Sequence, residues 1–168
     1  MTKAKGLLSL IALVAALALP KGARAYGQNL IPDFKVERMN LTLQEYSSPL
    51  VGMESVLIQT AEEYDLDWTL LAAIAGNESA FALRMPYECN NPFGWGIYGE
   101  NRLCFESLED SIREVGQGIA EKYNTDSLYT IARTYNPGNT EHWMGVTALY
   151  MQKIKNQAVP ASKLPIVL

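Results

Sequence analysis

Residues 70–79 read Leu70-Leu71-Ala72-Ala73-Ile74-Ala75-Gly76-Asn77-Glu78-Ser79, an apolar run that ends beside a glutamate. The run has no polar face, and a helix that is apolar on every side belongs in a protein core. Asp67 is a residue type that caps helices, so we expect a buried helix from Trp68 to about Ser79. The sequence therefore predicts a mainly α-helical domain built around this segment.

Four further segments show the three- and four-residue spacing of apolar side chains that is typical of amphipathic helices. The first follows Pro49, and the second begins at Ser107, a good N-cap with Asp110 three residues later. The expected helices cover residues 50–64, 107–123, 127–134 and 140–154. They are long enough to enclose the buried helix on several sides.

The first 25 residues have the features of a secretory signal peptide. Lys3 and Lys5 precede an apolar run that ends at Pro20, and Ala23-Arg24-Ala25 is a small-x-small cleavage site. A membrane anchor is the alternative, but the run is shorter than the roughly 20 apolar residues that span a bilayer. No later segment is apolar enough to span a membrane. We therefore expect cleavage before Tyr26 and export, to the periplasm or the cell exterior.

After cleavage, the expected organisation is one folded domain with short flanking segments. Residues 26–48 lack a sustained helical period, so they are predicted to be an N-terminal arm or linker, or else a segment that packs on the domain. Residues 49–157 form the expected catalytic domain, and residues 158–168 a C-terminal tail with two prolines.

The charge of the chain excludes one class of partner. The full sequence carries −4 at pH 7, and loss of residues 1–25 leaves ten basic against 18 acidic residues, a charge of −8. Nucleic-acid binding requires a basic surface, so we expect no nucleic-acid partner.

The cysteine content points to a disulfide rather than a metal site. Cys89 and Cys104 form no metal-type Cys-x-x-Cys pair, and in an exported protein one disulfide is the simplest account. Closing this loop of 16 residues would stabilise the fold by roughly 3 kcal/mol. With a single histidine in the chain, we expect no metal and no cofactor.

The pattern changes between Asn90 and Phe105, where aromatic residues and glycines alternate. Such alternation, with a turn at residues 98–101, predicts a β-hairpin of strands 93–97 and 102–105. In a strand, Gly94 and Gly96 would present bare backbone on one face, which a sugar ring can approach closely. The residues expected to bind substrate are Asn91, Phe93, Gly94, Trp95 and Gly96. For Trp95, as for Trp143, packing in the core is the alternative to stacking on a sugar.

Glu78 is a candidate general acid. It ends a helix whose preceding turns are apolar, and both low-dielectric surroundings and the negative end of the helix dipole raise the pKa of a carboxyl group. A carboxylic acid that keeps its proton is what glycoside cleavage requires of its proton donor. The alternative is a solvated glutamate where the helix reaches the surface.

Two motifs in order, Gly76-Asn77-Glu78-Ser79-Ala80-Phe81 and Asn90-Asn91-Pro92-Phe93-Gly94-Trp95-Gly96, resemble the bacterial endo-β-N-acetylglucosaminidase family and its lytic transglycosylase relatives in the lysozyme superfamily. The resemblance covers roughly residues 50–155. It implies a mainly α (α+β) fold, a lysozyme-like helical domain with one small β-hairpin beside the active-site cleft. It also implies that Glu78 is the catalytic acid and that Tyr135 lies near it, although a tyrosine that ends a helix is often a packing residue.

The function implied by this resemblance is a peptidoglycan hydrolase that cleaves the β-1,4 glycosidic bonds of the glycan strand. Two alternatives stay open: a lytic transglycosylase that forms anhydro-muramyl ends, and a catalytically silent glycan-binding module that docks on the cell wall or joins an assembly partner in the cell envelope. An exported helical interaction protein is a further alternative. A Ser-His-Asp hydrolase has less support, because His142 is the only imidazole and no nucleophile-elbow motif is present.

A second catalytic carboxylate is not identified by the sequence. Glycosidases generally place a base or nucleophile opposite the acid. Glu88, Glu100 and Glu106 lie in or near the predicted hairpin, and Glu100, at its tip, is the preferred candidate. If none of them serves, the N-acetyl group of the substrate would act as an internal nucleophile.

Overall fold

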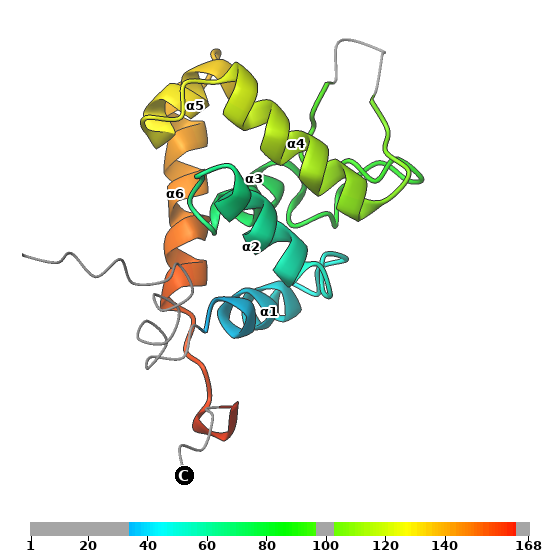
Figure 1. Ribbon diagram of the computed structural model, residues 1–168, viewed down its shortest axis with the longest axis vertical. Coiled ribbons are helices and arrows are strands. Elements are labelled where there is room, and N and C mark those ends of the chain that lie inside the picture. The colour runs from blue at the N-terminus through cyan, green and yellow to red at the C-terminus, as the bar shows by residue number, and fades with distance from the viewer. Residues whose placement is uncertain (1–33, 97–102, 164–168) are drawn as a thin grey trace, which may run out of the picture. The chain divides into compact units, whose positions relative to one another are not determined.

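The computed structural model describes residues 34–96 and 103–163, which belong to one compact unit. Their α-helices are α1 (Lys35–Glu45), α2 (Glu54–Glu63), α3 (Leu70–Ser79), α4 (Leu108–Lys122), α5 (Leu128–Tyr135) and α6 (Thr140–Asn156), followed by the short 3-10 helix η2 (Ala161–Lys163) (Figure 1). None of the described helices is both long and apolar enough to cross a membrane. The predicted signal peptide lies outside the described residues.

Helix α3 occupies the centre of this unit. Leu70–Gly76 are all buried, as the apolar run predicts, and α2 and α6 pack against the helix (Figure 1). The helix begins two residues later than expected. Asp67 accepts hydrogen bonds from the N–H and the hydroxyl of Thr69, so it caps the preceding turn instead of the helix itself.

The N-cap of α4 agrees with the sequence, and α5 begins with a cap that the sequence analysis did not single out. Ser107 accepts a hydrogen bond from the N–H of Asp110, and Ser127 forms a capping box with Thr130. Such caps satisfy backbone donors that a helix leaves without partners in its first turn. They thereby fix the residue at which each helix starts.

The expectation of an extended arm is wrong for residues 35–45, which form α1. Met39, Thr42 and Leu43 are fully buried, and α1 packs on α2 and α6. The buried stripe is narrow and includes a threonine, so its helical period is weak in the sequence. These residues instead agree with the alternative expectation, a segment that packs on the domain.

The predicted β-hairpin is absent, and with it the α+β part of the expected fold class. No strand occurs in the described residues, and the two segments expected as strands, as far as they are described, are turns and irregular chain. Gly94 and Gly96 have φ values of +62° and +65°, which interrupt an extended chain. The backbone N–H and C=O of Trp95 both bond to the side chain of Asn91 instead of to a neighbouring strand. Residues 97–102, including Glu100, lie outside the described residues.

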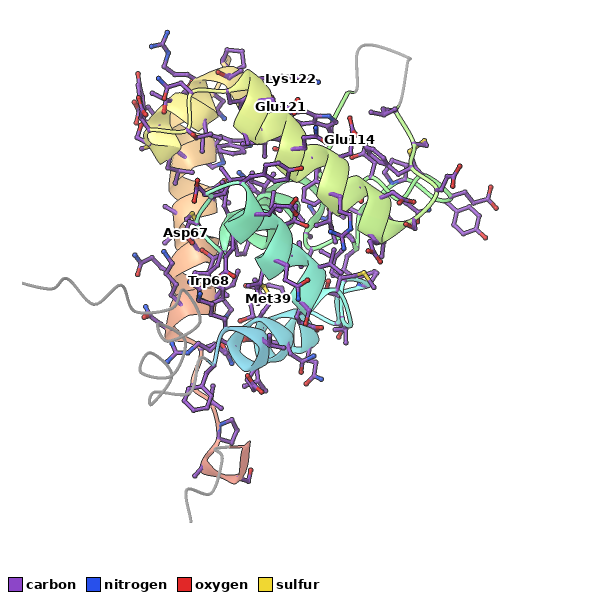
Figure 2. All side chains as sticks on the ribbon, viewed as in Figure 1. Met39, Asp67, Trp68, Glu114, Glu121 and Lys122 are labelled. Atoms are coloured by element: carbon purple, nitrogen blue, oxygen red, sulfur yellow. A yellow bond between two sulfur atoms is a disulfide. The ribbon has the colours of Figure 1, made fainter. Side chains whose placement is uncertain are left out.

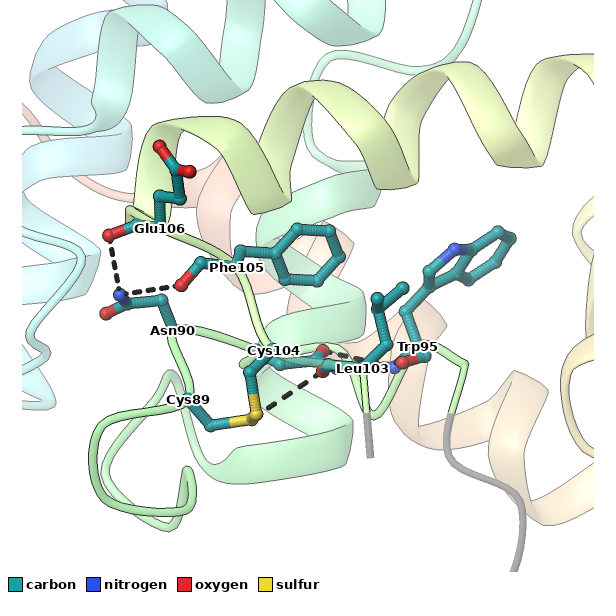
Figure 3. The surroundings of a disulfide bond; sticks show 8 residues. Cys89, Asn90, Trp95, Leu103, Cys104, Phe105 and Glu106 are labelled. Atoms are coloured by element: carbon teal, nitrogen blue, oxygen red, sulfur yellow. Dashed lines mark hydrogen bonds between the residues drawn. A yellow bond between two sulfur atoms is a disulfide. The ribbon is translucent and has the colours of Figure 1, made fainter. Parts of the chain in front are cut away.

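A disulfide between Cys89 and Cys104 joins the two segments, as predicted (Figure 3). Side-chain amides add to the connection: Asn90 donates to the carbonyl oxygens of Phe105 and Glu106, and Asn91 donates to that of Leu103. The N–H of Phe105 donates to the carbonyl of Cys89. As far as they are described, the segments are thus held side by side by a covalent bond, asparagine side chains and a single backbone hydrogen bond instead of a ladder.

The close packing of α2 on α4 gives a test of the fold. A Cβ atom at Gly116 of α4 would lie 2.5 Å from Thr60 Cγ2 of α2, whereas at Gly145 of α6 nothing lies within 4 Å. We expect Gly145→Ala to stabilise the fold by about 0.5–1 kcal/mol through helix propensity. Gly116→Ala should instead destabilise it by about 1–3 kcal/mol through overpacking. Denaturant unfolding of both variants measures this, and a Gly116→Ala variant as stable as Gly145→Ala would contradict the described packing.

Candidate active site

Several residues of the segment Gly76–Phe81 have an identifiable structural role. Gly76 leaves room for the ring of Phe81, because a Cβ there would lie 2.7 Å from the ring tip. The hydroxyl of Ser79 lies within hydrogen-bonding distance of the carbonyl of Pro92 (2.7 Å), and it accepts from the N–H of Ala82. Helix α3 therefore ends in a tight turn, and Ser79 ties that turn to the loop that contains Gly94.

Glu78 lies at this helix end with its two carboxyl oxygens in different surroundings. The indole N–H of Trp143, in α6, donates to Oε1 at 2.6 Å. A Cβ built on Gly94 would lie 3.4 Å from Oε2, so this oxygen faces bare backbone. Asn77 secures the neighbouring helix by donating to the carbonyl of Trp143 and the hydroxyl of Thr147.

Burial raises the pKa of Glu78 above its ordinary value, in the direction expected from the sequence. The hydrogen bond from Trp143 acts in the opposite sense, because it stabilises the charged carboxylate. By surface area Glu78 as a whole is exposed, so the helix reaches the surface there, as the alternative of a solvated glutamate expects. The protein around its carboxyl group nevertheless removes enough water for burial to outweigh the hydrogen bond. The site therefore favours a carboxyl group that stays protonated to higher pH than an ordinary glutamate.

The hydrogen bond also determines which oxygen carries the proton. An indole N–H only donates, so Oε1 must accept from Trp143. In the protonated acid, the proton is therefore best placed on Oε2, the oxygen that faces Gly94. A group that approaches over the Gly94 backbone would meet this proton directly.

Tyr135 supports this arrangement from the end of α5. Its ring stacks on Trp143 with centroids 4.8 Å apart, and its hydroxyl donates to the carbonyl of Phe93 at 2.6 Å. Burial, with a further contribution from the charge of Glu78, raises the pKa of Tyr135 well above its ordinary value. The tyrosine is thus a neutral phenol that holds Trp143 and the Phe93–Gly94 loop together, and its own proton is already engaged.

The loop residues predicted to bind substrate have different places in the structure. Asn91 and Phe93 are buried, so their side chains shape the loop from within. Gly94, Trp95 and Gly96 line a pocket of about 540 Å³ together with Tyr123 and Tyr135. Gly94 therefore joins the pocket to the carboxyl group of Glu78.

The remaining candidate residues are not brought to Glu78 in the described part of the chain. Glu88 and Glu106 are exposed, and no described interaction joins either of them to Glu78. His142 is exposed on α6. Within residues 34–96 and 103–163, no group of three or more histidine, cysteine, aspartate or glutamate side chains has the arrangement of a metal site.

The sequence did not identify Trp143 as the partner of Glu78. Trp143 is 3% exposed, so its ring packs in the core, which was the alternative to stacking on a sugar. In the core its N–H also needs a hydrogen-bond acceptor. That need was a usable signal: a buried tryptophan on the last helix requires a polar partner from another element. Tyr123, which lies 5.6 Å from Trp95 between ring centroids, was likewise not singled out.

The raised pKa of Glu78 predicts a pH-dependent stability difference. The folded state binds this proton more tightly than the unfolded chain, so the contribution to stability is complete below the unfolded pKa and is lost as pH rises through the folded pKa. Glutamine does not titrate. We therefore expect Glu78→Gln to gain stability relative to wild type as pH rises from about 4 to about 8, measured by denaturant unfolding. Glu106→Gln, which removes an exposed carboxyl group, is the control, and an equal gain in that variant would contradict the assignment to Glu78.

Because known proteins offer no match, the function of the site is inferred from its geometry. No protein-family model, no curated protein and no solved structure matched the chain. The features that bear on chemistry are the carboxyl oxygen at Gly94 and the aromatic pocket beside it.

Proposed function

We propose that this chain is an enzyme that cleaves β-1,4 glycosidic bonds in peptidoglycan glycan strands, with Glu78 as the general acid. The observation that carries the proposal is the placement of Oε2, on a carboxyl group whose pKa burial raises, against bare backbone at the edge of a pocket. General acid catalysis of glycoside cleavage needs a proton donor of this kind.

The pocket fits a saccharide in size and chemistry. Its volume of about 540 Å³ is in the range of small-molecule sites. Trp95, Tyr123 and Tyr135 supply aromatic rings with polar edges, which suit the apolar faces and hydroxyl edges of sugar rings. Gly94 and Gly96 also line the pocket, and at Gly94 the absence of a side chain exposes main-chain groups beside Glu78, whereas Leu103 packs close to Gly96.

In the proposed reaction, Oε2 of Glu78 transfers its proton to the glycosidic oxygen as the bond to the anomeric carbon breaks. Charge then develops at the sugar ring in an oxocarbenium-like transition state. Meanwhile, Oε1 stays bonded to Trp143, which stabilises the carboxylate left behind. Trp143 thus assists the step without contact with the substrate.

The second half of the reaction has two candidates that use the same proton donor. In hydrolysis, water attacks the anomeric carbon, with Glu100 proposed as the second carboxylate or the N-acetyl group as internal nucleophile. In lytic transglycosylation, a hydroxyl of the same sugar attacks and closes an anhydro ring. The described site contributes one carboxyl group, Glu78, which suits a reaction where the substrate supplies the nucleophile.

Export to a cell-wall compartment accords with this activity. The disulfide between Cys89 and Cys104 is a bond that forms and persists in oxidising compartments. The apolar segment with its cleavage site, within residues 1–25, supplies the proposed route. Enzyme and substrate would then meet outside the cytoplasm.

Glu78→Gln tests the proposal most simply. Glutamine keeps the shape and an oxygen for Trp143 but has no proton to transfer, so cleavage of purified sacculi should fall by about 10²–10⁴-fold or more. Turbidity loss measures cleavage, and co-sedimentation with sacculi measures binding, which should persist. Wild-type cleavage by a folded Glu78→Gln variant would overturn the assignment. Binding without cleavage by the wild-type protein would instead indicate a silent glycan-binding module.

Trp143→Phe should move the pH dependence of the reaction. The variant removes the hydrogen bond that lowers the pKa of Glu78, so this pKa rises further. A general acid is active while protonated, and the decline in rate at alkaline pH should therefore shift to higher pH. Trp95→Phe is the matched control, because it leaves the hydrogen bond to Glu78 in place. A shift to lower pH, or an equal shift in both variants, would contradict the role given to Trp143.

A further inference from the structure

Lys122, in the last turn of α4, forms no ion pair with a carboxylate of the described residues. Helices α1–α6 contain four lysines, and the other three are paired: Lys35 with Glu62, Lys153 with Glu45 and Lys155 with Asp67. The ammonium group of Lys122 lies instead over the ring of Trp95, 6.0 Å from its centroid. Although the chain has an excess of acidic residues, no described carboxylate neutralises this positive charge.

The unpaired charge lies on the pocket described above. Lys122 lines that pocket with Trp95 and Gly94, the residue that faces Oε2 of Glu78. Figure 2 shows Lys122 at the end of α4 nearest α5, with Glu114 further back along the same helix. Glu114 lines the same pocket, but it is eight positions from Lys122, which corresponds to about 12 Å between their backbones along the helix. The positive charge therefore lies at one end of the pocket and the negative charge further along it. The neighbouring carboxylate of Glu121 is engaged by the amide of Gln117.

A second cation lies close to the same end of the pocket. Thr134 lines this pocket and also a smaller one of about 270 Å³, which Arg133 lines with Asn124 and Thr130. No ion pair in the described residues includes Arg133. The pocket is thus aromatic near Gly94, with Lys122 lining it at the end of α4, Glu114 lining it further along α4, and Arg133 in the adjoining smaller pocket.

We propose that Lys122, supported by Arg133, selects a saccharide that carries a carboxylate over a neutral one. The aromatic rings would hold a sugar ring, and the ammonium group would pair with an anionic substituent on that sugar or its neighbour. The inference rests on the proposed function, because it takes this pocket as the substrate site. It names the substrate class: an acidic glycan, in which the carboxylate belongs to the sugar itself or to a peptide attached to it.

Binding measurements on the Glu78→Gln variant test this without turnover. The ligands are a β-1,4-linked N-acetylglucosamine–N-acetylmuramic acid tetrasaccharide with free lactyl carboxylates and its methyl ester. We expect the free acid to bind roughly fivefold more tightly, the size of a favourable exposed ion pair. Adding Lys122→Met should reduce the preference to about onefold while it keeps an unbranched side chain over Trp95. A third ligand, with the lactyl group amidated by a peptide that carries the carboxylate, distinguishes the two sources of charge.

Lys153→Met in the same background is the matched control. Lys153 also lies near the end of its helix and over an aromatic ring, that of Tyr46 at 5.4 Å, but it does not line the pocket. It should leave the preference unchanged. Three results would overturn the proposal. They are equal binding of acid and ester, no binding of either acidic ligand, and an equal loss of affinity for acid and ester in Lys122→Met. The last result would show that Lys122 only stabilises the end of α4.

The outcomes separate this inference from the proposed function. If the wild-type protein cleaves no glycan but binds carboxylates selectively through Lys122, the proposed enzyme activity is contradicted and the selectivity is supported. If the wild-type protein cleaves sacculi but binds acid and ester equally, the enzyme activity is supported and the selectivity is contradicted.

Discussion

The burial of Leu70–Gly76 in α3 is the constraint on which the rest of the described structure depends. The helix leaves the core in its polar last turn, where Ser79 is buried, Asn77 is half-buried and Glu78 is exposed, and the buried polar groups need partners. Asn77 donates a hydrogen bond to the carbonyl of Trp143 in α6, and Glu78 accepts one from the indole of Trp143. The hydroxyl of Ser79 bonds to the carbonyl of Pro92. These three hydrogen bonds connect α3 to α6 and to the loop that contains Gly94, so one packing requirement fixes the surroundings of the candidate acid.

The same requirement explains why the site has an asymmetric carboxyl group. Trp143 is buried and must place its N–H on an acceptor, and Glu78 Oε1 is that acceptor. Oε2 is left facing Gly94, which has a positive φ and no side chain to lie between this oxygen and the loop backbone. Stability of the core and availability of a proton therefore come from one contact, and the pocket beside Gly94 provides the space in which a substrate would meet it.

The sequence predicts most of the helices and the direction of the pKa shift of Glu78 because those features follow from local patterns. The apolar run 70–76, the N-cap residue Ser107 and the pairing of two cysteines depend on neighbouring residues or on simple counting. The hairpin prediction was wrong because alternation cannot distinguish a strand from a loop in which Asn91 takes the backbone groups of Trp95. The hydrogen bond between Trp143 and Glu78 spans 65 residues of sequence, and only the packing of α6 on α3 reveals it.

The central claim is that Glu78 delivers a proton to a glycosidic oxygen of peptidoglycan, and mass spectrometry of fragments released from purified sacculi tests it most directly. Wild-type protein should release muropeptides with new reducing glucosaminyl or muramyl ends, or with anhydro-muramyl ends, and Glu78→Gln should release none of them. Fragments with intact glycan linkages, or identical fragments from both proteins, would contradict the claim.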